Sequence, residues 1–263
     1  MAQKDVGNKV PIYKLKKTDE VMKYYDEWGE GNKYDKDMVN WNYTGPKSRD
    51  VLQKVVREEV SNKNFKFRDS KRMYVAGVPA IVNRISFTGE LGYEIYVAPH
   101  YQLKLYEQLT DAGKEFNIKP FGLRALMSMR LEKNWGAWTL DYRPDFTAKE
   151  TGLDTFINWD KEFIGKKFAK DDNSKNKLIP MIVETNEIDV TYNEAVLKND
   201  KAIGYITSGG FAHFVNKSIA FSYLDTQELN SGKGIQVEIN GDLFNCSIIK
   251  EPLYDPSGQK MRS

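Results

Sequence analysis

Apolar and polar residues begin to alternate regularly near residue 38, after a highly charged opening stretch without a clear period. We therefore predict an irregular N-terminal segment over residues 1–40. Within that segment, apolar residues at helical spacing predict one short helix face. The residues of that face are Val21, Met22, Tyr24, Tyr25 and Trp28.

Strands and helices are interleaved in the next part of the chain. Strict alternation predicts strands, and apolar residues three and four positions apart predict amphipathic helices. The predicted strands cover residues 39–43, 72–75, 79–87 and 92–97, and the predicted helices cover 47–59, 101–113, 122–133 and 165–170. A polar run at 171–177 ends this part. The mixture predicts an α+β domain over residues 41–175.

Short apolar runs separated by glycine turns make up the rest of the chain. They predict strands at 178–184, 202–207, 218–224, 234–239 and 243–249. Asn240-Gly241, between the last two runs, is the strongest hairpin signal in the sequence. Strands at this spacing predict a small sandwich or barrel over residues 176–263.

Composition excludes several classes of protein. The hydrophobic fraction is 40%, which is enough for a folded core, and no apolar run approaches the roughly 20 residues of a membrane helix. The formal net charge of +2 gives no general attraction to nucleic acid or to an anionic membrane.

Cys246 is the single cysteine, so an intrachain disulfide is impossible and a reducing, cytoplasmic location is expected. One cysteine and two histidines also leave little material for a metal site.

The stretch from Arg84 to Glu94 is the densest group of candidate functional residues. It holds Glu90 and Glu94 around two glycines that allow a tight turn and a close approach of a flat ligand. If residues 92–97 form a strand, Glu94 and Tyr96 share one face. A carboxylate there could accept paired N–H bonds from a heteroaromatic amine. A hairpin with exposed glutamates is the alternative, and the pattern alone favours it.

Two further groups remain open on spacing alone. Ser208-Gly209-Gly210 follows an apolar strand but lacks the spacing of a phosphate-binding P-loop, so a tight turn within a barrel is predicted. His213, three residues after this segment, has two interpretations, a general base or an exposed histidine.

Trp135 and Trp138, near Asp141, also have two interpretations: they line a ligand site, or they belong to the core.

A series of segments stands in one order from about Tyr43 onward. The segments are Thr44–Arg49, Arg84–Glu94, Met129–Lys133, Glu150–Leu153, Trp159–Lys166, Thr207–Gly210, Asn216–Ala220 and Pro252–Pro256. In this order they resemble the folate-binding aminomethyltransferase family. That family includes the T-protein of the glycine cleavage system and the folate regions of dimethylglycine and sarcosine dehydrogenases.

The resemblance implies a fold, a function and a set of site residues. The implied fold is a ferredoxin-like, aminomethyltransferase-type folate-binding domain, here incomplete, followed by a C-terminal β-barrel. The implied ligand is tetrahydrofolate, with Glu94 on the pterin N–H edge, Phe87 at a stacking position that usually holds tyrosine, and Arg262 near the folate. Leu126 stands where the T-protein has a second folate-binding arginine, which favours the dehydrogenase branch.

That branch implies one-carbon units from N-methyl amines such as dimethylglycine, sarcosine or glycine-type donors. A separate flavin dehydrogenase subunit would then be a partner, because no early Gly-x-Gly-x-x-Gly motif for a flavin occurs in this chain.

The front of the chain departs from the family pattern. A full family domain has a much longer stretch before Gly45, and that stretch contains a catalytic aspartate. The candidate aspartates here have no recognisable context, and they are Asp5, Asp19, Asp26, Asp35 and Asp37. The catalytic residue is therefore unassigned. The alternatives to an enzyme are a non-catalytic folate-binding or regulatory module and a truncated remnant.

Overall fold

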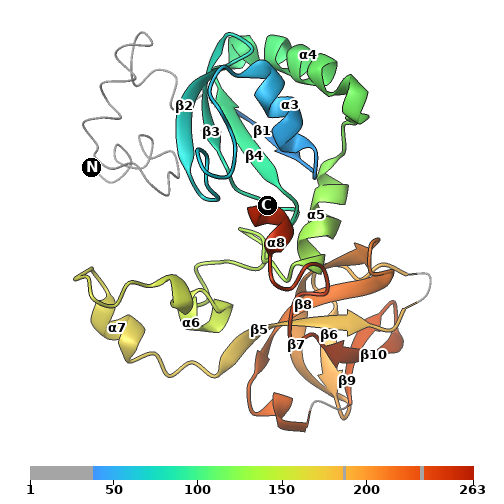
Figure 1. Ribbon diagram of the computed structural model, residues 1–263. Coiled ribbons are helices and arrows are strands. Elements are labelled where there is room, and N and C mark those ends of the chain that lie inside the picture. Colours follow the sequence, from blue (N-terminus) through green and yellow to red (C-terminus); the bar gives the residue numbers. More distant parts are fainter. Residues whose placement is uncertain (1–37, 186–187, 232–233) are drawn as a thin grey trace. The chain divides into compact units, whose positions relative to one another are not determined.

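The computed structural model describes residues 38–263 apart from 186–187 and 232–233 (Figure 1). The predicted helix face around Val21 and Trp28 lies outside the described residues, as do the candidate aspartates up to Asp37. Contacts divide the chain into two compact units. Unit 1 contains the chain up to Phe121 together with Ser257–Ser263, and unit 2 contains Gly122–Pro256.

Unit 1 is built on a four-stranded antiparallel sheet in the order β1-β4-β3-β2. Its strands are β1 (Val39–Thr44), β2 (Ser70–Val75), β3 (Val78–Asn83) and β4 (Gly92–Val97). Its helices are α3 (Ser48–Val55), α4 (Gln102–Gly113), α8 (Gln259–Arg262) and the 3-10 turns η2 (Pro99–Tyr101) and η3 (Lys114–Phe116). Apolar residues of α3 and α4 pack with every second residue of the strands in one buried cluster. One face of the sheet is therefore covered by these two helices.

Two predicted elements in unit 1 are longer than the real ones. The helix predicted over 47–59 ends at Val55, because Val56 adopts an extended conformation with φ −124° and ψ 152°. The strand predicted over 79–87 ends at Asn83, and one residue later the backbone of Arg84 still bonds with the segment before β2, since its N–H donates to the carbonyl of Asp69 and its carbonyl accepts from Arg68. The strand predicted over 92–97 has the bounds of β4.

Unit 2 contains a closed six-stranded barrel in the order β10-β5-β8-β7-β6-β9. The strands are β5 (Asn176–Val183), β6 (Ala195–Lys198), β7 (Lys201–Ala212), β8 (Lys217–Asp225), β9 (Ile235–Ile239) and β10 (Asp242–Ile248). The helices are α5 (Leu123–Glu132), α6 (Ala148–Thr151), α7 (Lys166–Lys170), η4 (Asp154–Phe156) and η5 (Glu228–Ser231). An α+β domain followed by a β-barrel is the predicted fold class, and the structure confirms it.

The barrel corrects two details of the prediction. Strand β6 was not predicted, because it is four residues long and has one buried residue, Val196. Ser208-Gly209-Gly210 is not a tight turn, because all three residues lie inside β7 and pair with β8. The hairpin at Asn240-Gly241 is confirmed, and both residues have the positive φ that a type I′ turn requires, 53° and 91°.

The boundary between the two units differs from the domain boundary predicted at residue 175. Helix α5 packs on the barrel, where Leu131 joins Ile219 and Phe221 in one apolar cluster. Helix α6 contacts β5 in the same unit. By contact, residues 122–175 group with the barrel strands, and the domain boundary at residue 175 stays a prediction.

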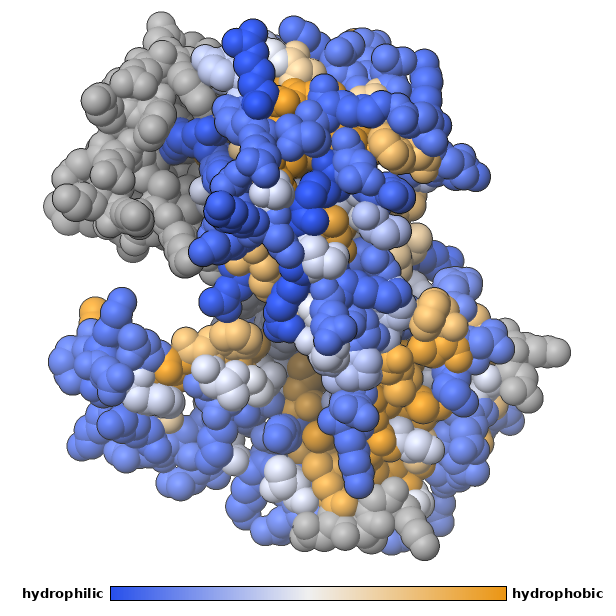
Figure 2. All heavy atoms as spheres, in the orientation of Figure 1, coloured by the Kyte–Doolittle hydropathy of each residue, from blue (hydrophilic) through white to orange (hydrophobic). Residues whose placement is uncertain are grey.

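The face drawn in Figure 2 is mostly hydrophilic, with local apolar patches. Apolar residues are visible on the segment that carries α6 and α7, and strongly exposed residues there are Phe156, Ile164 and Phe168. Among the helices that the structure describes, none is both long and apolar enough to cross a membrane.

Candidate functional site

A row of polar side chains crosses the sheet of unit 1 on the face opposite α3 and α4. Asn83 of β3 pairs with Glu94 of β4, and Glu94 pairs with Asn42 of β1. The neighbouring pair, Val82 and Ile95, belongs to the helix-covered core. Since side chains alternate along a strand, the polar row must point to the other side. We call Asn42, Asn83, Glu94 and Tyr96 the polar face.

Glu94 is held in place by a neighbour on its own strand. The hydroxyl of Tyr96 donates to Oε2 of Glu94 across 2.6 Å, and Asn40 of β1 donates to the same hydroxyl oxygen across 3.4 Å. Glu94 is half-buried, so its carboxylate is fixed but not enclosed by protein. The prediction that Glu94 and Tyr96 share one face is confirmed, and the alternative of freely exposed glutamates does not hold for Glu94.

Asn83 has an unusual environment for a polar residue. Its exposed fraction is 1%, and neither its amide nitrogen nor its amide oxygen has a hydrogen-bond partner among the described residues. A buried amide without partners costs free energy of about 1–3 kcal/mol. Sequence reasoning missed this residue, although a polar residue at the end of the apolar run Val78–Val82 was the available signal.

The loop between β3 and β4 is anchored to the start of α3. The hydroxyls of Thr44 and Thr88 lie 2.7 Å apart, and the carbonyl of Leu91 accepts from the backbone of Gly45 and from the hydroxyl of Ser48. The Thr-Gly-Pro-Lys-Ser turn therefore fixes the loop that precedes Glu94. Phe87 is a half-buried residue of this loop.

Arg84 begins the same loop and is fully buried. Its guanidinium donates to the carbonyl of Phe65 and to the carbonyls of Arg262 and Ser263 at the end of α8, and Arg49 donates to the Ser263 carbonyl as well. Burial and, to a smaller extent, the neighbouring Arg49 lower the pKa of Arg84. Two cationic side chains thus hold the end of α8 by the backbone oxygens of Arg262 and Ser263.

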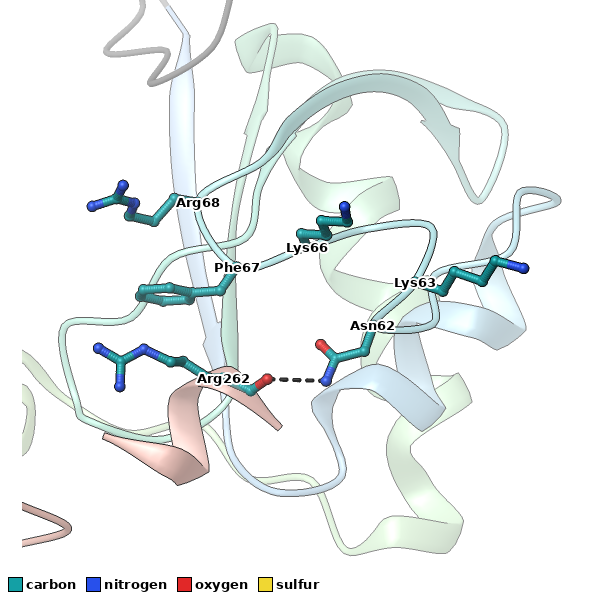
Figure 3. A pocket seen from close by; sticks show the side chains of 6 residues that line it. All are labelled: Asn62, Lys63, Lys66, Phe67, Arg68 and Arg262. Atoms are coloured by element: carbon teal, nitrogen blue, oxygen red, sulfur yellow. Dashed lines mark hydrogen bonds between the residues drawn. The ribbon is translucent and has the colours of Figure 1, made fainter. Parts of the chain in front are cut away.

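Arg262 lines a basic cavity of about 680 Å³ in unit 1. The lining residues are Asn62, Lys63, Lys66, Phe67, Arg68 and Arg262. Figure 3 shows Arg68, Phe67 and Arg262 pointing to one side, with the aromatic ring between the two guanidinium groups, whereas Lys63 points away. The Arg262 guanidinium lies 5.9 Å from the Phe67 ring and donates to the carbonyl of Ser257 across 2.6 Å. Such a cavity is suited to an anion.

The predicted site residues therefore fall into three places within unit 1. Glu94 lies on the polar face, Phe87 in the loop before it, and Arg262 in the basic cavity. Neither Glu94 nor Phe87 is among the residues that line that cavity.

Asp141 of unit 2 is fully buried and accepts four hydrogen bonds. Its donors are the guanidinium of Arg130, the backbone of Ala137, and the hydroxyls of Thr207 and Ser208. Burial lowers the pKa of Arg130, while Asp141 acts in the opposite direction. A carboxylate with every donor supplied by protein is a structural centre, so the Ser-Gly-Gly segment serves the barrel. Gly209 is required there, because a Cβ would lie 2.8 Å from the carbonyl oxygen of Val190.

The residues after Arg130 also anchor the barrel unit. The Glu132 carboxylate accepts from the backbone N–H of Phe214 across 2.7 Å, and the Lys133 ammonium donates to the carbonyls of Tyr254 and Asp255. The Met-Arg-Leu-Glu-Lys segment is therefore structural.

The nearby tryptophans and histidine form no comparable cluster. Trp138 is 76% exposed, and His213 is an exposed residue whose ring lies edge-on to Phe211 with 5.1 Å between centroids. Over the described ranges, no group of three or more His, Cys, Asp or Glu side chains is placed to hold a metal ion.

Two family models match the sequence. Residues 17–161 match the GCVT N-terminal domain, and residues 176–255 match the glycine cleavage T-protein C-terminal barrel domain. Human mitochondrial dimethylglycine dehydrogenase is 37% identical over 214 residues, which are 80% of this chain and 25% of that protein. The aminomethyltransferase of Caldanaerobacter subterraneus is 33% identical over 221 residues, which are 82% of this chain and 58% of that protein.

A solved structure shares the fold. The crystal structure of the glycine cleavage system aminomethyltransferase T from Bartonella henselae matches with a TM-score of 0.73 and 21% sequence identity. The match covers 83% of this chain and 60% of that one. The chain thus spans a quarter of the human dehydrogenase and less than two thirds of the aminomethyltransferases.

Proposed function

The chain belongs to the glycine cleavage T-protein family of aminomethyltransferases, and from that premise we propose that unit 1 binds tetrahydrofolate at the polar face of its sheet. The observation that carries the proposal is the Glu94 carboxylate, which Tyr96 orients across 2.6 Å and which lies in register with the buried amide of Asn83. A half-buried carboxylate accepts hydrogen bonds only, and the edge of a pterin ring offers neighbouring N–H donors.

The other predicted residues extend this proposal. Phe87 would stack on the folate without the hydroxyl contact that a tyrosine adds. Arg262 would meet the negatively charged end of the folate, because the cavity that it lines is basic and contains an aromatic ring. These two roles rest on the family resemblance and on the location of both residues in unit 1.

Tetrahydrofolate, when bound, supplies secondary amine nitrogens that take up a one-carbon unit. In the reaction, Glu94 of this chain would hold the edge of the folate ring. This contact would fix the orientation of the reacting nitrogens. We propose N-methyl amines of the dimethylglycine and sarcosine type as donors, because dimethylglycine dehydrogenases of human, mouse and rat are relatives at 37% identity.

A separate flavin dehydrogenase is the proposed partner. This proposal rests on the similarity to dimethylglycine dehydrogenases, and the match covers a quarter of the human protein. A cytoplasmic location stays a prediction from the single cysteine, and the mammalian relatives are mitochondrial proteins.

A non-catalytic folate-binding module is the second candidate. It requires only the Glu94 site of unit 1, whose carboxylate Tyr96 orients across 2.6 Å. A truncated remnant would also lack catalysis, but it would not bind a reduced folate with a Glu94-dependent affinity.

Titration of the whole chain with tetrahydrofolate tests the proposal. We expect saturable binding that Glu94→Gln weakens at least ten-fold, because the charged acceptor is lost. Glu90→Gln is the matched control, since Glu90 lies in the preceding loop near Lys260 and should leave the affinity unchanged. Absence of binding below the millimolar range, or equal affinity for Glu94→Gln and the wild type, would contradict the proposal.

An assay of one-carbon transfer separates the enzyme from the binding module. A flavin dehydrogenase that oxidises dimethylglycine is mixed with tetrahydrofolate, with and without this chain. Faster formation of methylene-tetrahydrofolate in the presence of the chain supports the enzyme. A rate equal to the uncatalysed background, together with Glu94-dependent binding, supports the module.

A further inference from the structure

The polar face contains a second side chain, Asn83, whose environment indicates a role in ligand binding. We propose that Asn83 binds the same folate ring as Glu94 and donates a hydrogen bond to the ring carbonyl beside the N–H edge. This inference deepens the proposed function and rests on it. It is carried by the geometry and the burial of Asn83 itself.

The register places the two side chains together. Asn83 and Glu94 are directly opposite residues on antiparallel strands, and they belong to one face of the sheet. Directly opposite residues have Cβ atoms roughly 4.5–5.5 Å apart. One flat ring bound on this face would span both groups once the atoms that cover the Asn83 amide move aside.

The two groups differ in what they can offer a ligand. The Glu94 carboxylate already accepts from Tyr96 and can accept further bonds from ring N–H groups. The Asn83 amide has an N–H₂ donor and an oxygen acceptor, and both are without partners among the described residues. A folate ring presents N–H donors next to a carbonyl acceptor. Asn83 supplies the donor that a carboxylate cannot.

The surroundings of Asn83 support a role in binding over a role in folding. Ile81 stands two residues earlier on the same face, is buried, and packs with Met38 and Tyr96. A leucine at position 83, between Ser70 and Glu94, would leave no buried polar group unsatisfied. The free protein therefore gains nothing from the amide, and a ligand is the partner that makes it useful.

The test compares the stability and the affinity of one variant. Asn83→Leu should melt at the same temperature as the wild-type chain or higher, and should bind tetrahydrofolate at least ten-fold more weakly. Ser70→Ala is the matched control, because Ser70 is opposite Asn83 on the side away from Glu94, and its affinity should equal that of the wild type.

A second readout identifies the ring atom. Folic acid has a ring carbonyl beside an N–H group, and aminopterin has an amino group there beside a ring nitrogen without hydrogen, so both Asn83 and Glu94 should contribute to the discrimination. The wild-type chain should prefer folic acid, and Asn83→Leu should reduce that preference several-fold without abolishing it, because the Asn83 donor to the ring carbonyl is lost while Glu94 remains.

Each other outcome counts against the inference. An affinity of Asn83→Leu within two-fold of the wild type would overturn it, and so would an unchanged preference between the two rings. A lower melting temperature for both Asn83→Leu and Asn83→Ala would assign Asn83 to the fold. If the wild-type chain itself fails to bind tetrahydrofolate, the proposed function fails first. If binding depends on Glu94 but not on Asn83, the inference about Asn83 is wrong and the proposed function stands.

Discussion

Arg130 and Asp141 form a salt bridge of 2.7 Å in which both side chains are fully buried. The same carboxylate accepts from Thr207 and Ser208 of β7 and from the backbone of Ala137. One charged group therefore joins helix α5, the turn after it and the longest barrel strand. The Asp141 carboxylate should therefore contribute to the stability of unit 2, since all of the donors that it binds are protein groups.

Asp141→Asn should destabilise the protein by about 3–5 kcal/mol, because it leaves the buried Arg130 guanidinium without a counter-charge. Urea denaturation measures the change. Asp145→Asn is the control, because Asp145 pairs with Arg143 at the surface with 59% of its side chain exposed and should cost less than about 1 kcal/mol. Equal losses for the two variants would contradict the structural role of Asp141.

Tyr96→Phe should weaken tetrahydrofolate binding by about three- to ten-fold. The variant removes the hydroxyl that donates to Glu94 and leaves the carboxylate less well oriented. Isothermal titration measures the affinity, and thermal melting checks that the fold is kept. Tyr74→Phe removes a hydroxyl from an exposed tyrosine of β2 and should bind like the wild type. Identical affinities for Tyr96→Phe and Tyr74→Phe would show that orientation of Glu94 has no part in binding.

Arg84→Met should release α8 from unit 1 and cost about 2–4 kcal/mol of stability. The variant removes the buried donor to the carbonyls of Phe65, Arg262 and Ser263. Hydrogen exchange of residues 257–263 should rise strongly. Lys47→Met, which breaks an exposed pair with Asp50 at the start of α3, should leave that exchange unchanged. Full protection of α8 in Arg84→Met would show that other contacts hold the helix.

Cys246 should react slowly with thiol reagents in the folded protein at pH 8. Burial raises the pKa of its thiol to about 12, with a smaller contribution from the negative charge of Glu184. Only the thiolate reacts, so labelling with a disulfide reagent should be slow until urea unfolds the barrel. Rapid labelling of the native protein would contradict the raised pKa of Cys246, a half-buried residue of strand β10.

The same raised pKa predicts a sign for the dependence of stability on pH. The thiol loses its proton near pH 9 in the unfolded chain and near pH 12 in the folded one, so the folded state binds the extra proton between these values. The contribution is complete below pH 9 and is lost as the pH rises toward 12. The wild type should therefore lose stability relative to Cys246→Ala over this range, and parallel curves would refute the link.

Local pattern was sufficient for much of unit 1 and for part of the barrel. Strict alternation from Gly92 to Val97 gave the bounds of β4 and the shared face of Glu94 and Tyr96, because both depend only on neighbours in sequence. The hairpin at Asn240-Gly241 could be predicted for the same reason, since a type I′ turn needs two residues that tolerate positive φ.

Features that depend on distant partners could not be predicted in this way. Ser208 resembles a turn residue locally, but its hydroxyl bonds with Asp141, which is 67 positions away in sequence. Asn83 gave a weak signal for a related reason. The pairing of β3 with β4 places it beside Glu94, and the absence of a hydrogen-bond partner is visible only when the packing around it is known.

The return of α8 to unit 1 has a consequence for synthesis on the ribosome. The chain leaves unit 1 at Phe121, builds the whole barrel, and comes back at Ser257. Arg84 must therefore wait, after its own emergence from the exit tunnel, for carbonyl groups that are translated nearly 180 residues later. Until then the Arg84 guanidinium lacks the hydrogen-bond acceptors that Arg262 and Ser263 provide. The barrel unit can therefore finish folding before α8 docks on unit 1, although the four strands of the sheet that carries Glu94 are all translated before the barrel.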